Sequence, residues 1–136
     1  TEDADAVLMT VGTVTGTARD VVDAYREKGK KVGLVKLRFL RPYPTEELRK
    51  VVSRVKAFGV YDRAVSFGVS GPNFIEAKSA LYGLQVPTVN FITGLGGRDV
   101  TVDDVAKMFD ALLEVAKTGK AKKPVVWLST RGVDEW

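Results

Sequence analysis

The chain has no cysteine and no histidine among its 136 residues. Without thiolates it cannot hold an iron–sulfur cluster or form a disulfide, and it cannot build a zinc site from cysteine and histidine. Without imidazole it also lacks the side chain that most often serves as a general base near neutral pH. Any redox or acid–base chemistry of the protein must therefore depend mostly on residues outside this chain.

Long apolar runs are missing as well, and the N-terminus has no pattern of positive, apolar and small residues. A membrane-spanning helix needs about 18 or more apolar residues, so we expect no membrane span and no signal peptide, and a cytoplasmic location. With 45% hydrophobic and 28% charged residues, the composition is typical of a single globular domain over residues 1–136. Because the first residue is Thr1, the simplest interpretation is a piece of a longer chain; loss of an initiator methionine is the alternative.

The net charge is only +4, from 21 lysine and arginine residues against 17 acidic ones. The basic residues cluster at Lys28, Lys30 and Lys31, and again between residues 117 and 123. One interpretation is an anionic partner such as a nucleotide. The favoured one is that lysines near helix C-termini complement the helix dipole and keep the surface soluble. No basic motif is interleaved with aromatic residues, so we expect no nucleic-acid partner.

Short apolar runs alternate with amphipathic helical patterns four times, and one further apolar run follows. This order predicts an α/β fold: a three-layer α/β/α sandwich with a mostly parallel five-stranded sheet. The first run is almost entirely apolar, as is typical of a strand buried on both faces. The predicted strands are residues 6–11, 31–39, 59–61 with an extension through 65–67, 87–93 and 125–128.

End signals position the helices between these runs. The first helix follows a loop over residues 12–16 and ends at Gly29. Thr45 is expected to cap the second helix, and Pro72 suits the first turn of the third. Thr101 and Asp104 have the spacing of a capping box for a last helix that begins at Val102.

Two glycine-rich loops are candidate sites. Gly12, Thr13, Thr15, Gly16 and Thr17 lie between a strand and a helix, where free backbone N–H groups favour anions. The spacing matches neither established phosphate-loop pattern, and a turn with a helix cap from Thr15 or Thr17 is the simpler alternative.

The second loop contains Gly94, Gly96, Gly97, Arg98 and Asp99. Three glycines in four positions allow a tight turn and a close approach by another group. The loop follows a predicted strand of an α/β sheet, where ligand and interface sites gather. We therefore treat it as an interface or ligand loop, with a plain strand-to-helix connection as the alternative.

Other charged residues are weaker candidates. Arg41 ends a strand and can bind a carboxylate or phosphate in bidentate fashion, although a surface arginine explains it equally well. Asp62 and Arg63 are adjacent in a strand, so their side chains point to opposite faces and we assign them a structural role. No nucleophile lies beside a base and no paired carboxylates stand out, so no catalytic constellation is predicted.

Three segments together resemble a known family: residues 11–18 (VGTVTGTA), 29–44 (GKKVGLVKLRFLRPYP) and 94–101 (GLGGRDVT). Residues 60–63 (VYDR) and 66–68 (SFG) match between them. In this order they resemble the alpha subunits of the thiamine-dependent 2-oxoacid:ferredoxin oxidoreductases, and the pyruvate enzyme most of all. The resemblance covers nearly the whole chain.

The resemblance implies the second domain of such a subunit, similar to the C-terminal domain of transketolase, with a mixed five-stranded sheet in which one strand is antiparallel. The parent complex would decarboxylate pyruvate on thiamine diphosphate with Mg²⁺. It would pass two electrons through iron–sulfur clusters to ferredoxin and form acetyl-CoA from CoA. Those cofactors would belong to other domains and subunits, leaving this domain without a catalytic role.

Assembly and shaping of the active-site surroundings would remain for this domain. Both glycine loops would then face neighbouring domains or subunits, with Arg98 making a charge-assisted contact. Contact of Arg41 or the Lys28, Lys30 and Lys31 cluster with CoA is a weaker hypothesis. The alternatives are the C-terminal domain of a transketolase or 2-oxoacid dehydrogenase, and a free-standing domain that binds a nucleotide or another anion. Enzymes for 2-oxoglutarate and branched 2-oxoacids share the domain, so pyruvate is preferred on overall likeness only.

Overall fold

Strands and helices alternate along the chain, as the sequence predicts. The computed structural model describes residues 2–130. A short 3₁₀ turn, η1, precedes the last helix. The elements are β1 (Ala6–Val11), α1 (Val14–Glu27), β2 (Val32–Leu37), α2 (Thr45–Val52), β3 (Ala57–Asp62), α3 (Pro72–Ala80), β4 (Thr88–Ile92), η1 (Leu95–Gly97), α4 (Val102–Thr118) and β5 (Val125–Trp127).

All five strands form one parallel sheet in the order β2-β1-β3-β4-β5. This is the order of the flavodoxin-like, doubly wound folds. The antiparallel strand that the resemblance implies is absent from the described residues, so that expectation is wrong. The reason is that every connection contains one α-helix, which returns the chain to the same edge before the next strand begins.

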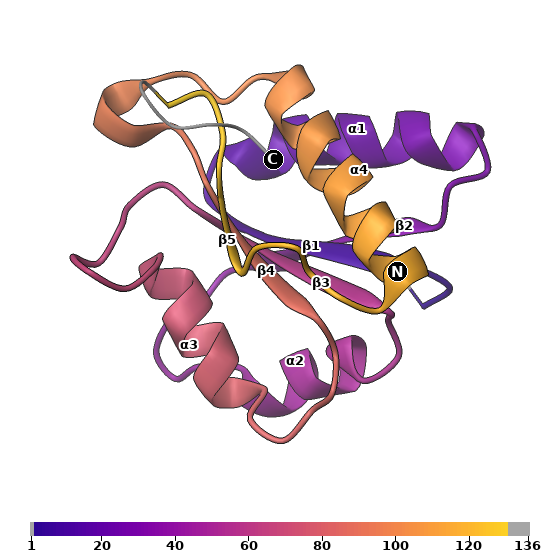
Figure 1. The fold of residues 1–136 in the computed structure, drawn as a ribbon, viewed down its shortest axis with the longest axis horizontal. Coiled ribbons are helices and arrows are strands. Elements are labelled where there is room, and N and C mark those ends of the chain that lie inside the picture. Colours follow the sequence, from indigo (N-terminus) through magenta and orange to yellow (C-terminus); the bar gives the residue numbers. More distant parts are fainter. Residues whose placement is uncertain (1, 131–136) are drawn as a thin grey trace.

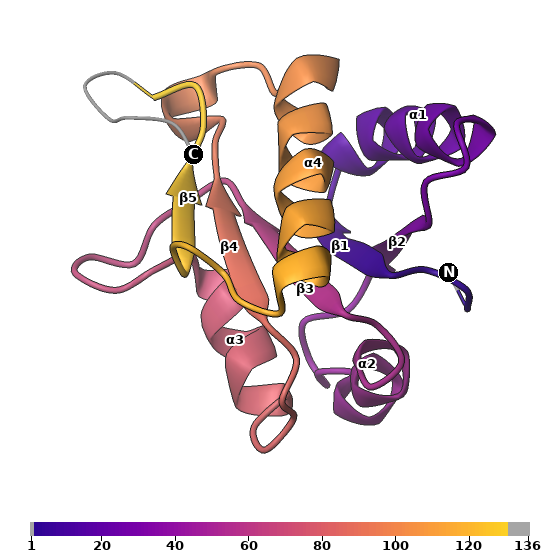
Figure 2. The ribbon, with the colours of Figure 1, turned by 45° about the vertical axis from the view of Figure 1, so that its right-hand side comes forward.

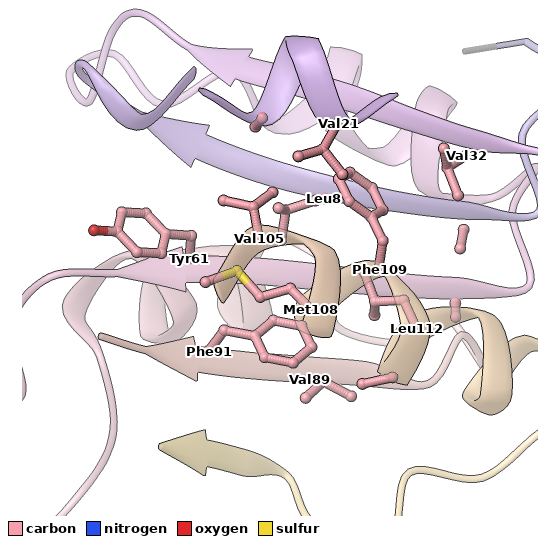
Figure 3. Packing of buried hydrophobic residues seen from close by; sticks show 14 of the residues in the cluster. Leu8, Val21, Val32, Tyr61, Val89, Phe91, Val105, Met108, Phe109 and Leu112 are labelled. Atoms are coloured by element: carbon pink, nitrogen blue, oxygen red, sulfur yellow. The ribbon is translucent and has the colours of Figure 1, made fainter. Parts of the chain in front are cut away.

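The helices form two layers around the sheet (Figures 1 and 2). Helices α1 and α4 cover one face and share a hydrophobic core with it, whereas α2 and α3 cover the other face. Figure 3 shows the first core, where Phe109 and Leu112 of α4 pack against Leu8 and Phe91 of the sheet. Gly59 of β3 lets α4 approach, because a Cβ there would lie 2.7 Å from the Leu112 side chain.

The connection from β4 through α4 to β5 has the opposite hand to the other three. The steps from β3 to β4 and from β4 to β5 cross the sheet in the same direction, yet α3 and α4 lie on opposite faces. Parallel crossovers are overwhelmingly right-handed, so this last unit is an exception. The exception involves only β5, a strand of three residues at the edge of the sheet. The other four strands form a regular doubly wound sheet.

Several element ends differ from the sequence predictions. The first helix begins at Val14, inside the predicted loop, and Thr45 is the first residue of α2 rather than its cap. The third strand ends at Asp62 and does not extend through residues 65–67. Val102 starts the last helix as predicted and is 55% exposed. The capping box of Thr101 and Asp104 is confirmed.

No helix among residues 2–130 has the length and apolar character needed to cross a membrane.

Candidate functional site

The sheet reverses its winding direction beside β1, which lies between β2 and β3. In doubly wound sheets ligands bind at such a switch point, in the crevice beyond the carboxyl ends of the strands. A hollow of about 360 Å³ lies there, lined by the β1–α1, β3–α3 and β4–α4 loops and by the ends of β1 and β3. We call it the switch-point hollow; its lining includes Thr13, Val14, Tyr61, Arg63, Asn73, Gly94, Gly96 and Gly97.

The first wall of the hollow is the start of α1. Gly12 has a φ of +79°, and Thr13 is the N-cap residue but makes no side-chain cap. The expected cap from Thr15 or Thr17 is wrong, since both residues lie within the helix. The Thr15 hydroxyl is buried, 3.0 Å from that of Thr10. Of the predicted anion loop, only Gly12 and Thr13 precede the helix; Thr15, Gly16 and Thr17 occupy its first turn.

The second wall is the start of α3, which is held by Asp62. The Asp62 carboxylate is fully buried and accepts hydrogen bonds from the backbone N–H groups of Asn73 at 2.8 Å and Phe74 at 3.0 Å. Asn90 of β4 donates to the same carboxylate at 2.9 Å and accepts from the Gly71 N–H at 2.8 Å. Gly71 must be small, because a Cβ would overlap the Asp62 carboxylate.

Asp62 therefore fills the position at which an external anion could bind to α3. Burial raises the pKa of Asp62 above its ordinary value, and the hydrogen bonds from Asn73, Phe74 and Asn90 act in the opposite direction. Its oxygens satisfy N–H groups that would otherwise be open to a phosphate. The start of α3 is thus closed to a nucleotide phosphate by a side chain of the protein itself.

The third wall is the glycine-rich loop between β4 and α4. Gly94, Gly96 and Gly97 all have positive φ, at +76°, +66° and +81°. Gly94 is also crowded, since a Cβ there would lie 3.0 Å from Val100 and 3.1 Å from Arg63. The tight turn predicted from the three glycines is confirmed, whereas an interface or ligand role for this loop stays a prediction.

Two arginines hold this loop in place. Arg63 donates to the carbonyl oxygens of Gly94 at 3.2 Å and Arg98 at 3.0 Å. Arg98 in turn donates to the carbonyl oxygen of Ser129, beyond β5, at 3.0 Å. The Ser129 hydroxyl donates to Asp104, the residue that completes the capping box of α4. Arg98 and Asp99 are both exposed. Arg63 and Asp62 point apart, as their adjacency predicts.

The candidate CoA residues do not form a single site. Arg41 follows β2 and pairs with Glu76 of α3 at 2.6 Å, whereas Lys30 and Lys31 precede β2. The six residues of β2 separate them by roughly 20 Å, because a strand rises about 3.3 Å per residue. Lys30 lies 4.3 Å from the centre of the Tyr25 ring and pairs with Asp110 at 3.5 Å. Lys28 caps the C-terminus of α1, in agreement with the helix-dipole interpretation.

Sequence reasoning missed two residues of the site, Tyr61 and Asn90. Tyr61 lines the hollow, and its buried hydroxyl has no hydrogen-bond partner in the described structure. Figure 3 shows the ring pointing its oxygen away from the core, toward the carboxyl ends of the strands. In the sequence Asn90 looks like an ordinary strand residue. The one feature that could have marked it is a polar side chain within an apolar run.

The residues of the site do not fit the cofactors that the resemblance implies. The chain has no cysteine for an iron–sulfur cluster, and residues 2–130 contain no group of three acidic, histidine or cysteine side chains able to hold a metal ion. The one buried carboxylate of the hollow, Asp62, already has its hydrogen bonds. What remains is a hollow lined mainly by the loops at the carboxyl ends of β1, β3 and β4.

Fold and site together define a doubly wound α/β domain in which the Asp62 carboxylate occupies the N-terminus of α3, a position where a phosphate could otherwise bind. Comparison with known proteins makes the assignment specific. Residues 4–105 match the family model described as pyruvate:ferredoxin oxidoreductase core domain II. The chain belongs to this family.

Curated relatives carry the same segment. The chain is 45% identical over 128 residues to the ketoisovalerate oxidoreductase subunit VorA of Pyrococcus furiosus, covering 93% of this chain and 32% of that protein. It is 42% identical over 121 residues to the pyruvate synthase subunit PorA of Methanosarcina barkeri, covering 87% and 30%. It is 39% identical over 133 residues to the alpha subunit of an NADH-dependent phenylglyoxylate dehydrogenase of Aromatoleum evansii, covering 96% and 32%.

The chain spans about a third of the length of these relatives. Among solved structures, a 2-oxoglutarate:ferredoxin oxidoreductase from Magnetococcus marinus matches with a TM-score of 0.61 and 17% sequence identity. The match covers 79% of this chain and 18% of that one. At this identity the likeness supports the fold alone.

Proposed function

We propose that the chain is domain II of the alpha subunit of a 2-oxoacid:ferredoxin oxidoreductase, and that it assembles and shapes the enzyme without taking part in its chemistry. The observation that carries this proposal is the family match over residues 4–105. The relatives support it, because nearly the whole chain aligns with about a third of each alpha or A subunit.

The parent reaction joins a 2-oxoacid and CoA to give an acyl-CoA and CO₂, with two electrons passed to ferredoxin. Thiamine diphosphate would supply the carbanion chemistry, and iron–sulfur clusters would carry the electrons. This chain offers no thiolate, no imidazole and no metal-binding group among its described residues, so these cofactors would be held by other parts of the complex. The isolated domain would therefore be inactive.

The substrate is proposed at the level of its class. Relatives of similar identity are named for ketoisovalerate, pyruvate and phenylglyoxylate. All three acids share the 2-oxoacid group and differ in the carbon skeleton attached to it. Pyruvate remains the finer proposal from overall likeness, and the comparison of relative rates with these three acids tests it.

Capture of the native complex tests the proposal. An antibody raised against this domain would be used anaerobically on cells that contain the protein, and the captured material would be assayed for iron, acid-labile sulfide and thiamine diphosphate. All three are expected together, with CoA-dependent reduction of ferredoxin by a 2-oxoacid. Thiamine diphosphate without iron would favour a dehydrogenase or transketolase, and a lone polypeptide with neither would contradict the proposal.

A further inference from the structure

The loops at the carboxyl ends of the strands carry one sign of charge almost throughout. The four loops over residues 12–13, 38–44, 63–71 and 93–101 contain four arginines and a single acidic residue, Asp99. The arginines are Arg38, Arg41, Arg63 and Arg98; all four are exposed, and Arg41 pairs with Glu76 of α3. Such a surface favours an acidic partner, and arginine is the cation enriched at protein interfaces.

Large apolar side chains are exposed on the same edge. Phe67 is 99% exposed and Val69 is 67% exposed in the β3–α3 loop, and Phe39 is 69% exposed in the β2–α2 loop. The Phe67 turn is ordered by hydrogen bonds from the Ser66 N–H to the Ser70 oxygen at 2.9 Å and from the Val69 N–H to the Ser66 oxygen at 3.0 Å. An ordered turn that holds an aromatic ring in water is typical of an interaction site.

The switch-point hollow opens on this edge and contains an unsatisfied hydroxyl. Tyr61 is 3% exposed, and its oxygen has no partner within residues 2–130. Burial raises the pKa of the Tyr61 phenol, while the nearby Arg63 guanidinium acts in the opposite direction. Thr93, which follows β4 on the same face of the sheet, also has a buried hydroxyl without a partner. Buried polar groups in native proteins almost always have partners.

The start of α1 adds donors to the same hollow. Thr13 and Val14 line it, no side chain caps this helix, and its first turn contains no acidic residue. The first N–H groups of a helix need acceptors and favour negative charge. In α1 those of Thr15 and Gly16 donate to the Gly12 and Thr13 carbonyls, so the donors offered to the hollow are those of Thr13 and Val14. By contrast, the N-terminus of α3 is satisfied by Asp62 and that of α4 by Thr101 and Asp104. Among these three helices, α1 alone lacks an acceptor from a side chain.

We propose that this edge of the sheet docks an acidic polypeptide surface of the parent enzyme, and that one Asp or Glu carboxylate of that surface enters the switch-point hollow. The carboxylate accepts hydrogen bonds from the Tyr61 hydroxyl and from the N-terminus of α1. Phe67 and Val69 pack against apolar side chains beside it, and the arginines face the remaining acidic residues. The inference rests on the proposed function, since it requires that the chain be assembled with further polypeptide.

Tyr61→Phe tests the central contact, because it removes one oxygen and leaves the ring. In the isolated chain the hydroxyl has no partner, so we expect the thermal midpoint to stay the same or rise. In the assembled enzyme the same change should weaken association by about tenfold or more, because a hydrogen bond to a carboxylate is lost. Association is measured as the yield of intact complex across a dilution series.

Tyr25→Phe is the matched control. The Tyr25 hydroxyl donates to Asp110 at 2.9 Å and to the Ala106 carbonyl at 3.2 Å, far from the hollow. We expect it to lower the midpoint of the isolated chain and leave association unchanged. A Tyr61→Phe variant that destabilises the isolated chain but assembles normally would overturn the inference. If an enzyme with iron and thiamine diphosphate still forms, the proposed function survives that failure.

A photoreactive phenylalanine analogue in place of Phe67 identifies the partner. A cross-link to a peptide of the parent enzyme with an acidic residue between apolar ones supports the inference. A cross-link to a second copy of this domain, or to a basic peptide, overturns it. Acetate and succinate are added to the isolated chain as probes of the carboxylate position: a rise of the thermal midpoint that Tyr61→Phe abolishes would support the inference.

Discussion

Asn90 and Asp62 bridge neighbouring strands at the carboxyl end of the sheet, with the Asn90 amide donating to the Asp62 carboxylate at 2.9 Å. Asn90 also donates to the Val60 carbonyl at 3.1 Å and accepts from the Gly71 N–H at 2.8 Å. Through this pair β3 and β4 jointly fix where α3 begins, because Asp62 also receives the N–H groups of Asn73 and Phe74. The second wall of the switch-point hollow is therefore built from two strands.

Asp62→Asn should destabilise the fold. Both carboxylate oxygens accept hydrogen bonds, so either orientation of an amide sets an NH₂ group against a donor. We expect a loss of about 1–3 kcal/mol in the free energy of unfolding, measured by urea denaturation. An unchanged midpoint would show that α3 does not need this carboxylate.

Gly71→Ala and Gly16→Ala form a matched pair. A methyl group at Gly71 would overlap Asp62, whereas nothing lies within 4 Å of a Cβ at Gly16 in α1. Gly71→Ala should destabilise the protein by about 1–3 kcal/mol, and Gly16→Ala should stabilise it by about 0.5–1 kcal/mol because alanine favours a helix. Thermal denaturation of the two variants side by side gives the sign of each effect.

Arg98→Ala should separate folding from assembly. In the isolated chain its exposed contact with the Ser129 carbonyl should be worth less than about 1 kcal/mol. If Arg98 becomes a buried contact in the parent complex, Arg98→Ala should make the free energy of assembly less favourable by about 2–4 kcal/mol. Turnover of the complex should fall as well. Arg54→Ala is the control, because Arg54 follows the C-cap of α2 and does not line the hollow. Normal assembly and turnover of the Arg98→Ala complex would remove the interface role of this loop.

The stability of the chain should fall between about pH 10 and 12. Burial and the hydrogen bond to Asp110 raise the pKa of Tyr25 to about 12, and burial raises that of Tyr43 to about 12. Because these tyrosines lose their protons near the ordinary tyrosine pKa of 10 in the unfolded chain, the folded state binds more protons in this window and loses stability as the pH rises. Chemical denaturation across this range measures the loss.

Tyr25→Phe should flatten part of that decline, since it removes one of the tyrosines whose pKa is raised by folding. The ultraviolet absorbance of ionised phenol gives an independent measurement. The phenols of Tyr25 and Tyr43 should titrate near pH 12 in the folded chain. In the unfolded chain their pKa should return to the ordinary value for tyrosine. A flat stability profile over this range would contradict the burial of these hydroxyls.

Local signals in the sequence were sufficient for most of the fold. The capping box of Thr101 and Asp104, Pro72 in the first turn of α3 and the buried run of β1 all depend on residues close in the chain. Alternation of strands and helices then determines the class of fold. The all-parallel arrangement of the sheet was harder to predict from the sequence, because it depends on pairing between strands that are far apart in the chain.

The site was predicted only in outline. The glycine loops and Arg98 are marked by composition, and their interface role stays a prediction. Tyr61 and Asn90 were missed, since their significance depends on the folded sheet: Asn90 meets Asp62 from another strand, and the Tyr61 hydroxyl is buried without a hydrogen-bond partner within residues 2–130. Thr15 shows the opposite error, because a hydroxyl beside a helix start suggested a cap and instead faces Thr10.

The three-residue strand β5 also has a consequence for motion. Within residues 2–130 it pairs only with β4, and Ser129 in the segment after it contacts both Arg98 and Asp104. Opening of β5 would therefore release the glycine loop from that side while the four-stranded remainder of the sheet stays intact. Amide hydrogens of β5 and of the glycine loop should exchange with solvent at a common rate, well ahead of those in β1 and β3. The lifetime of a short edge strand would then govern how long the surface above the hollow keeps its shape.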